Sequence, residues 1–356
     1  MKEEFLKQKL DRMSLQNKLG QMLFIDYRDT KEMTVDLEKV LTKYSPGGFI
    51  VFRSNMSDYN TMSRFLHDIK DMGEVKPIIA ADHEGGRVQK LADVGLTRLP
   101  SALEIAGTMS EEEIFELAKK VGEELKTFGV DMDMAPVLDI VTNPETSRGI
   151  GDRSFGPNPE VVKRLSMAFA KGLKEGNVMA VGKHFPGHGA VSGNTHIDLQ
   201  SIEKDLNELR AFDLIPFVEA INQKLPGIMI GHLAVPKVTG NNTPAPMSQF
   251  LISDLLKKDL GHEGIVVTDS LKMGALAKNF TEREIYLRCA EAGNDMLLMP
   301  QNINVAYETL YNAVNDGLIT MDRIDDAVYR ILSIKFDYGF FDNEYKEFVN
   351  SHNKVR

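Results

Sequence analysis

Short runs of hydrophobic residues recur along the whole chain and are separated by longer segments of mixed polarity. The eight runs cover residues 21–27, 47–53, 77–84, 130–138, 178–184, 226–233, 264–270 and 294–299. Most of them are nearly continuous in hydrophobicity and do not alternate between polar and apolar positions. This pattern is typical of parallel β-strands that are covered by helices.

The segments between these runs show the periodicity of amphipathic helices. Residues 110–128 are the clearest case: Ser110 and Glu113 form a capping-box pattern, apolar positions fall on one helical face, and Gly129 follows as a stop signal. Similar patterns cover residues 159–175, 203–223, 248–258, 281–292, 303–316 and 321–336. Strands that alternate with helices in this way predict an α/β fold, a (β/α)8 TIM-type barrel. A doubly wound open sheet is the alternative, but no G-x-G-x-x-G motif follows the first run.

The chain has no linker rich in Pro, Gly or Ser and no abrupt change in composition. At about 150 residues per domain, 356 residues could form two domains, but barrel enzymes of about 250 residues or more form one. We therefore expect a single domain over residues 1–342 and a polar C-terminal tail over 343–356 that frays. Residues 1–20 are expected to form a helix against the bottom or side of the barrel.

Composition narrows the range of functions. The chain has 42 basic and 52 acidic residues, a net charge of −10, which argues against nucleic acid or an anionic membrane surface as the main partner. Its one cysteine, Cys289, excludes an internal disulfide framework and a zinc site built from cysteines. No run of about 18 apolar residues occurs, and the first five residues are charged and mixed, without a signal-peptide pattern. The prediction is a cytoplasmic protein without a membrane span.

Polar side chains gather where the predicted strands end. They are Asp82, Glu84, Asp139, Lys183, His184, His232 and Asp269. In a (β/α)8 barrel the carboxyl ends of all strands open onto one face, where catalytic residues lie. The sequence therefore predicts that these side chains share one pocket.

Asp269 closes the buried run 264–268. A carboxylate at that position is costly unless it is hydrogen-bonded, paired or used in chemistry. One interpretation is a nucleophile that attacks the anomeric carbon of a sugar and forms a covalent glycosyl-enzyme. The other is a helix N-cap, because residues 270–273 could begin a helix.

The segment 183–196 carries three histidines in a glycine-rich loop. It could bind a metal through His184, His188 and His196, although the spacing fits no standard zinc signature. Alternatively, Lys183 and His184 donate hydrogen bonds to a polar ligand while His196 transfers protons. For His188 the simpler interpretation is that it satisfies backbone groups in a turn.

The segment 82–87 follows another buried run. Paired carboxylates such as Asp82 and Glu84 suit the recognition of vicinal hydroxyls, since each accepts more than one hydrogen bond. A structural ion pair between Glu84 and Arg87 is the competing expectation. Arg153 could reach into the pocket or belong to a capped turn, and spacing alone leaves both open.

Six segments in order carry a resemblance to a known family: residues 13–22, 82–88, 135–139, 153–156, 183–189 and 268–273. They resemble glycoside hydrolase family 3, and more narrowly its single-domain bacterial β-N-acetylhexosaminidases of the NagZ type. The run Lys-His-Phe-Pro-Gly-His-Gly at 183–189 is the most specific, because it separates this subgroup from the β-glucosidases of the family.

The resemblance implies a (β/α)8 barrel and a retaining double displacement. It places Asp269 as the nucleophile and His196 as the acid/base residue, and it matches Asp82, Arg153, Lys183 and His184 to positions that hold the sugar. The implied substrate is a saccharide with a terminal non-reducing β-GlcNAc, from cell-wall muropeptides or chitin-derived oligosaccharides. No metal or other cofactor is implied, and we expect a monomer.

One position departs from the family pattern. The motif usually ends in Asp-Ser-His, where the Asp orients the His, whereas this chain has Asn194, Thr195 and His196. An asparagine can hydrogen-bond the ring but brings no negative charge to raise its pKa. Asp198 lies two residues further on and is a possible substitute.

Two other functions compete with hydrolysis. A β-glycoside phosphorylase is the first, because a neutral Asn194 leaves no carboxylate there to repel a phosphate dianion. The second is a saccharide-binding protein that has lost efficient acid catalysis.

Overall fold

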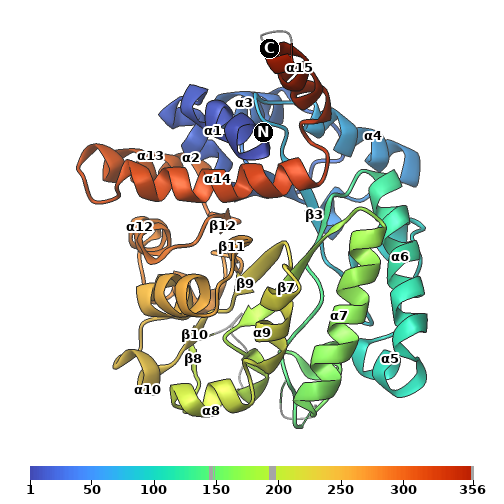
Figure 1. Cartoon of the computed structure of the whole chain (residues 1–356). Helices are drawn as coiled ribbons and strands as arrows, with labels where there is room; N and C mark the ends of the chain where they lie inside the picture. The colour runs from blue at the N-terminus through green and yellow to red at the C-terminus, as the bar shows by residue number, and fades with distance from the viewer. Residues whose placement is uncertain (144–146, 148, 192–197, 354–356) are drawn as a thin grey trace.

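The computed structural model describes residues 1–143, 147, 149–191 and 198–353, and its centre is a barrel of parallel strands surrounded by helices (Figure 1). The eight strands are β1 (Leu23–Ile25), β2 (Gly48–Ile50), β3 (Ile78–Ala81), β6 (Met132–Asp133), β7 (Met179–Phe185), β9 (Gly227–Ile230), β11 (Ile265–Thr268) and β12 (Leu297–Leu298). Seven of them fall inside the predicted runs, and β7 ends one residue beyond its run of 178–184. The predicted (β/α)8 barrel is confirmed.

The order of strands in the sheet is β11-β9-β7-β6-β3-β2-β1-β12, and every neighbouring pair is parallel. The two ends of the sheet meet through a parallel bridge between Val267 and Met296. There the N–H of Thr268 donates to the carbonyl of Met296 at 3.1 Å. The sheet is therefore closed, and all its carboxyl ends face one mouth.

The helices around the barrel are α1 (Lys2–Arg12), α2 (Leu15–Gln21), α3 (Val35–Tyr44), α4 (Tyr59–Lys70), α5 (Ala102–Thr108), α6 (Glu111–Phe128), α7 (Pro159–Glu175), α8 (Leu206–Ala211), α9 (Ile215–Asn222), α10 (Pro236–Thr239), α11 (Gly274–Ala277), α12 (Glu282–Ala292), α13 (Ile303–Asn315), α14 (Met321–Asp337) and α15 (Asp342–Asn353). A π-helical segment spans Phe250–Asp259. Short strand pairs lie outside the barrel: β4 (His83–Gly85) with β5 (Val88–Gln89), and β8 (Gln200–Ser201) with β10 (Leu233–Ala234).

Local signals in the sequence explain where α6 begins and ends. Ser110 and Glu113 form the predicted capping box, and Gly129 ends the helix with φ of 112°, a left-handed conformation that favours glycine. Two other expectations differ from the structure. The helix expected over 203–223 is divided into α8 and α9, and the segment expected as a fraying tail over 343–356 is helical up to Asn353.

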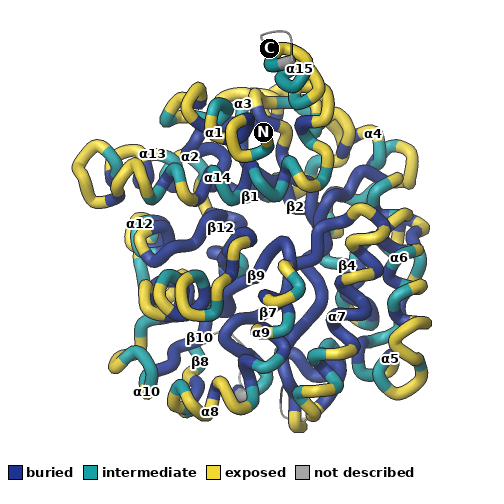
Figure 2. The backbone as a smooth tube through the Cα atoms, viewed as in Figure 1, coloured by how far each residue is buried: buried dark blue, intermediate teal, exposed yellow. Residues whose placement is uncertain are grey.

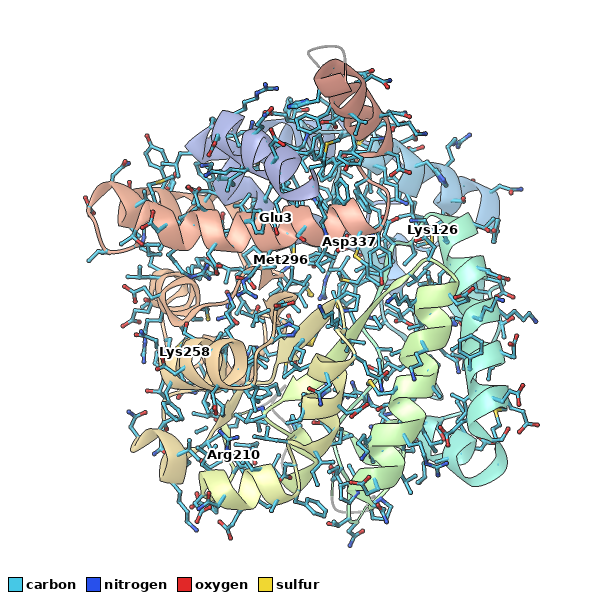
Figure 3. All side chains as sticks on the ribbon, viewed as in Figure 1. Glu3, Lys126, Arg210, Lys258, Met296 and Asp337 are labelled. Atoms are coloured by element: carbon cyan, nitrogen blue, oxygen red, sulfur yellow. The ribbon has the colours of Figure 1, made fainter. Side chains whose placement is uncertain are left out.

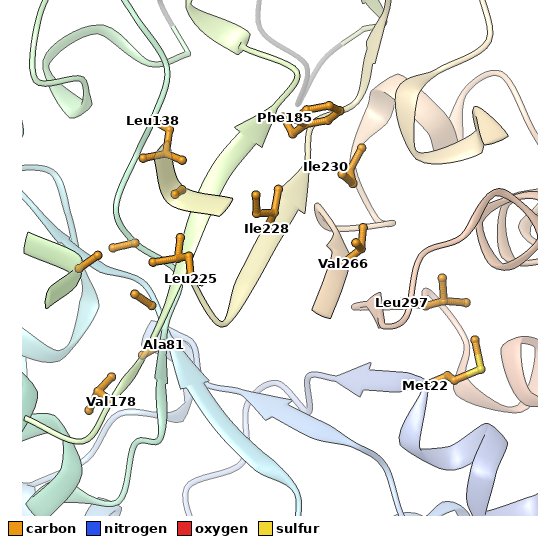
Figure 4. Close-up of a cluster of buried hydrophobic side chains, with 14 of the residues drawn as sticks. Met22, Ala81, Leu138, Val178, Phe185, Leu225, Ile228, Ile230, Val266 and Leu297 are labelled. Atoms are coloured by element: carbon orange, nitrogen blue, oxygen red, sulfur yellow. The ribbon is translucent and has the colours of Figure 1, made fainter. Parts of the chain in front are cut away.

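Two hydrophobic layers hold the barrel together. Strand residues such as Met132, Met179 and Val267 fill its interior, and Ile331 of α14 closes that layer at the end where the strands begin. Residues that point outward, such as Val266 and Ile228, pack against the surrounding helices (Figure 4). Because both faces of each strand are buried (Figure 2), the strands read as continuous apolar runs.

Charged side chains such as Arg210 and Lys258 are exposed at the periphery, whereas Met296 is fully buried at the centre (Figure 3). Within the part of the chain that the structure describes, no helix is both long and apolar enough to cross a bilayer.

Candidate active site

A cavity of about 470 Å³ opens at the carboxyl ends of the strands. Five residues predicted as site residues line it: Asp82, Arg153, Lys183, His184 and Asp269. They come from segments far apart in the sequence and meet here because the parallel strands end at one mouth. Of the seven strand-end residues expected to share one pocket, Asp82, Glu84, Lys183, His184 and Asp269 line this cavity, whereas Asp139 and His232 do not.

A network of opposite charges forms one wall of the cavity. Arg153 donates two parallel hydrogen bonds of 2.7 Å to Glu84, from Nε to Oε2 and from Nη2 to Oε1. Lys183 Nζ lies 2.5 Å from Glu84 Oε1 and 3.3 Å from Asp82 Oδ1, and Lys90 Nζ bonds the other oxygen of Asp82. Cations and carboxylates therefore alternate, and each side chain is held by its neighbours.

This network keeps both carboxylates ionised. Burial raises the pKa of Glu84, but Arg153 and Lys183 outweigh it and lower that pKa to about 2. Burial opposes the shift at Asp82 as well, yet Lys90 and Lys183 hold the pKa of that carboxyl below its usual value. Both residues present acceptors to a ligand at neutral pH.

The expected ion pair between Glu84 and Arg87 is wrong. Arg87 Nη1 instead donates to Asp152 Oδ1 at 2.6 Å, and Glu84 bonds Arg153 and Lys183. The sharp β4–β5 turn carries Arg87 away from Glu84, although the two lie three residues apart. Arg153 accordingly reaches the cavity and is more than part of a capped turn.

Asp139 fixes the orientation of His184. Its Oδ2 accepts from His184 Nδ1 at 2.7 Å, and its Oδ1 accepts the backbone N–H groups of His184 at 3.2 Å and His188 at 2.6 Å. Asp139 is fully buried, and burial raises its pKa, but the two histidines and their N–H groups outweigh burial and lower it. Because Asp139 occupies Nδ1, His184 presents Nε2 to the cavity.

Asp269 stands directly after β11 at the edge of the cavity. Its N–H donates to Ile230 O at 3.0 Å, and its Oδ1 accepts from Ser270 N at 2.7 Å. Burial raises the pKa of Asp269, but His232, His184, the Ser270 N–H and Lys183 together lower it below its ordinary value. The residue is therefore a carboxylate at neutral pH.

The N-cap interpretation of Asp269 is wrong. The next helix, α11, begins at Gly274 and has Met273 at its N-cap position. Asp269 bonds the N–H of its immediate neighbour and lines the cavity. An ionised, accessible carboxylate at the end of a barrel strand has the properties of a nucleophile.

Comparison with known proteins identifies the family. The model of the glycosyl hydrolase family 3 N terminal domain matches residues 14–334 of this chain. This chain belongs to glycoside hydrolase family 3. The curated relatives of this family 3 chain include the β-hexosaminidase LpqI of Mycobacterium tuberculosis, 33% identical over 91% of this chain and 83% of that protein. A β-hexosaminidase of Methylococcus capsulatus is 36% identical over 75% of this chain and 79% of its own length.

Solved structures agree with the family assignment. A family 3 β-N-acetylglucosaminidase from Paenibacillus sp. str. FPU-7 superposes with a TM-score of 0.87 and 33% identity, over 92% of this chain. This chain spans only 63% of the length of that protein. The structure of M. tuberculosis LpqI has a TM-score of 0.85 and 31% identity, over 93% of this chain and 96% of that one.

Two predicted catalytic residues of this family 3 chain, Asn194 and His196, lie outside the described residues. Asp198, considered as a substitute partner for His196, is described: it is exposed, and its Oδ1 accepts from Leu199 N at 2.9 Å. Among the described residues, no group of three or more His, Cys, Asp or Glu side chains is arranged to hold a metal ion. The metal interpretation would also need His196, so it stays untested.

The sequence did not single out several residues that line the cavity of this family 3 chain: Arg28, Phe52, Lys90, Met229, Lys272 and Leu298. Asp139 was noted only as a strand-end residue, and its role became visible through its contacts with His184. Arg28 directly follows the first predicted strand and Phe52 lies near the end of the second, and these positions are a signal that could have found them. Lys90 lies beyond a hairpin, so spacing from a strand does not reveal it.

Proposed function

We propose that this chain removes a terminal non-reducing β-linked GlcNAc from a saccharide by a retaining double displacement. The observation that carries the proposal is the ionised Asp269, which faces the same cavity as Asp82, Arg153, Lys183 and His184. The relatives named β-hexosaminidase and β-N-acetylglucosaminidase support the choice of sugar.

In the first step, a carboxylate oxygen of Asp269 attacks the anomeric carbon as the bond from that carbon to the leaving oxygen breaks. The leaving oxygen takes a proton from His196, a role that rests on the resemblance to the family. In the second step, water gives a proton to His196 and attacks the same carbon, which releases GlcNAc and restores Asp269. Asp82, Arg153, Lys183 and His184 hold the sugar hydroxyls throughout.

The charges of the cavity favour water over phosphate as the second substrate. The cations of its inner part are paired with carboxylates among the described residues: Lys90 with Asp82, Lys183 with Asp82 and Glu84, and Arg153 with Glu84. A phosphate dianion entering beside Asp269 would meet paired cations and several carboxylates. Hydrolysis is therefore our proposal, and phosphorolysis is the alternative to be tested.

The decisive experiment compares aryl β-glycosides of GlcNAc, GalNAc, glucose and xylose on the wild type and on Asp269→Asn. We expect turnover of the GlcNAc glycoside, and a fall in kcat of about 10³-fold or more in the variant because the nucleophile is lost. A 2-fluoro glycoside should label the peptide that contains Asp269, as read by mass spectrometry. Unlabelled Asp269 with intact turnover would overturn the mechanism, and no turnover of any glycoside would favour a saccharide-binding protein.

Hydrolysis and phosphorolysis are separated by their products. We expect free GlcNAc as the β-anomer at early times, in water and in phosphate buffer alike. Sugar 1-phosphate formed in phosphate would instead assign the chain as a phosphorylase. Because the mechanism uses no metal or cofactor, we expect activity to persist after treatment with a chelator.

The departure at Asn194 leads to a prediction about pH. A general acid must be protonated, so kcat falls as pH rises through the pKa of His196 in the complex. Asn194→Asp places a negative charge beside the ring, which favours the imidazolium and moves this alkaline limb upward by about one pH unit. Asn194→Ala, which adds no charge, is the control. An identical pH profile of kcat in Asn194→Asp and wild type would contradict the role of His196 or its contact with residue 194.

The natural substrate that we propose is a cell-wall muropeptide or a chitin-derived oligosaccharide that ends in β-GlcNAc. Peptidoglycan recycling in the cytoplasm, as a monomer, is the setting that the sequence predicts. Cell fractionation and a sedimentation measurement test the location and the oligomeric state.

A further inference from the structure

Two cations share one buried carboxylate at the mouth of the cavity. Lys272 Nζ lies 2.6 Å from Asp26 Oδ1, and Arg28 Nε lies 3.0 Å from Asp26 Oδ2. The side chain of Asp26 is only 2% exposed, whereas those of Lys272 and Arg28 are 32% and 51% exposed. The carboxylate is thus hidden beneath two accessible cations.

These cations lie apart from the residues that hold the sugar in our proposal. Asp26 and Arg28 follow β1, and Lys272 follows β11, three residues beyond Asp269. Around the closed sheet, β12 alone separates β11 from β1. The sugar-holding residues follow or belong to β3, β6 and β7, so β2 separates them from β1 and β9 separates them from β11. A sugar held there by its hydroxyls would turn its anomeric carbon toward the side of β11. The group attached to that carbon leaves on the ring face opposite Asp269 and would pass through the mouth that Arg28 and Lys272 line.

The balance of charge differs between these two parts of the cavity. In the inner part, the cations of Lys90, Lys183 and Arg153 face the carboxylates of Asp82, Glu84 and Asp269. At the mouth, Arg28 and Lys272 face the single carboxylate of Asp26. The inner part therefore suits a neutral sugar, and the mouth has a net charge of one positive unit.

Arg28 is arranged to accept a further partner. Among the described residues its guanidinium is hydrogen-bonded through Nε alone, to Asp26. The group lies 4.8 Å from the centre of the Phe52 ring, which limits its movement. Its two terminal nitrogens can therefore form the bidentate pair that a guanidinium makes with a carboxylate.

We propose that Arg28 and Lys272 are specificity-determining residues that bind a carboxylate on the leaving-group side of the scissile bond. The inference rests on the proposed glycosidase function for the placing of the sugar. Lys90 does not compete for this role, although its Nζ lies 3.9 Å from the centre of the Phe52 ring, because Asp82 already binds its ammonium group.

The test uses a matched pair of probes, the 4-carboxyphenyl and 4-carbamoylphenyl β-glycosides of GlcNAc. They differ in charge and hardly in shape. For wild type, Arg28→Gln, Lys272→Gln and the control Lys278→Gln, the ratio of kcat/KM for acid over amide is measured. Lys278 is exposed, and its replacement removes the same unit charge from a residue that does not line the cavity.

We expect the ratio to fall about twofold to fivefold in Arg28→Gln and in Lys272→Gln, because an accessible ion pair contributes an effect of that size. The ratio should stay unchanged in Lys278→Gln. Added salt should lower the wild-type ratio and leave that of Arg28→Gln nearly constant. An unchanged ratio in both cavity variants, or the same fall in Lys278→Gln, would overturn the proposal.

Calorimetric binding of the two probes to Asp269→Asn, with and without Arg28→Gln, separates this inference from the proposed function. An acid preference that disappears with Arg28 supports the inference even if the wild type hydrolyses neither probe. Equal binding of acid and amide to Asp269→Asn counts against it, whatever the turnover.

Discussion

At the scale of single residues, Asp139 is the buried group that orients His184 in the site. It accepts three hydrogen bonds, two from His184 and one from His188. Asp139→Asn turns one acceptor oxygen into a donor that faces existing donors, so His184 must shift. We expect kcat/KM to fall by about 10²-fold, the effect of a displacement near 1 Å, and the protein to lose about 3–5 kcal/mol of stability.

The control for Asp139→Asn is Asp254→Asn, the same chemical change on an exposed residue of the π-helical segment. Aryl glycoside kinetics and urea unfolding measure the two effects. Normal kcat/KM in folded Asp139→Asn would show that His184 needs no positioning by this carboxylate.

Asp133 gives a prediction about stability and pH. It is fully buried, its Oδ1 accepts from His83 N at 2.9 Å, and burial, aided by Asp82 and Glu84, raises its pKa to about 7. The unfolded chain releases this proton near pH 4. Between about pH 4 and 7 the folded state therefore binds more protons than the unfolded state, and Asp133 lowers stability as pH rises through this window.

Asp133→Asn keeps the acceptor for His83 N and cannot ionise. We expect the stability of this variant relative to wild type to improve by about 1–3 kcal/mol between pH 5 and pH 8, since each pKa unit corresponds to about 1.4 kcal/mol. Urea unfolding at the two pH values measures the difference. A relative stability that is independent of pH would mean that Asp133 is already ionised in the folded protein at pH 5.

The sequence located the site residues better than it located their partners. Asp82, Lys183 and Asp269 could be placed together because each ends or follows an apolar run, and the barrel brings these ends to one mouth. Which residues form ion pairs depends on the direction in which each side chain points once the chain has left its strand. Glu84 therefore bonds Arg153, 69 residues away, and not Arg87, three residues away.

At the scale of elements, helix breaks were harder to predict than helices. The apolar pattern over 203–223 continues through Pro216, but proline has no N–H and sits in the first turn of α9, so the chain divides there. Likewise, 343–356 looks polar overall, yet Tyr345 and Phe348 pack their rings against Phe5 of α1. A few aromatic contacts across the sequence outweigh average polarity.

The contact between α1 and α15 leads to a prediction that a substitution lowers stability and leaves activity unchanged. Phe5 is 6% exposed and touches the rings of Phe336, Phe341, Tyr345 and Phe348. Phe5→Ala should cost about 3–5 kcal/mol of unfolding free energy, because it leaves a cavity among these rings. Lys335, beside this cluster, bonds the carbonyl of Lys76 just before β3, so the cluster lies at the end of the barrel opposite the active site.

Because of that distance, kcat of Phe5→Ala should equal that of wild type at temperatures where both are folded. Phe250→Ala is the matched control. Phe250 is 40% exposed, so its replacement should lower the unfolding free energy only slightly. Urea unfolding and aryl glycoside kinetics measure the two quantities. A loss of unfolding free energy below about 1 kcal/mol would show that these rings do not hold α15 against α1. Reduced kcat in folded Phe5→Ala would show that the cluster is coupled to the active site.

At the scale of the whole molecule, the barrel was predictable because eight apolar runs alternate with helices along one chain. The side chains that fill its interior could not be predicted in the same way. The interior layer includes Met132, Met134, Met179, Met229, Met296 and Met299. An apolar run does not say which of its residues point inward, and the strand register that decides this depends on all neighbouring strands.

That filled interior predicts how the enzyme attacks a saccharide chain. Ile50, Met229, Leu298 and Met299 belong both to the interior layer and to the lining of the cavity, so the cavity ends against the packed barrel and does not pass through it. A saccharide can enter only by its tip, and the bond cleaved should be the one next to the terminal sugar. With chitotetraose labelled at its reducing end, we expect labelled products to shorten by one GlcNAc at a time, as followed by mass spectrometry. Labelled mono- or disaccharide appearing before labelled trisaccharide would show internal cleavage and would contradict a site closed at its inner end.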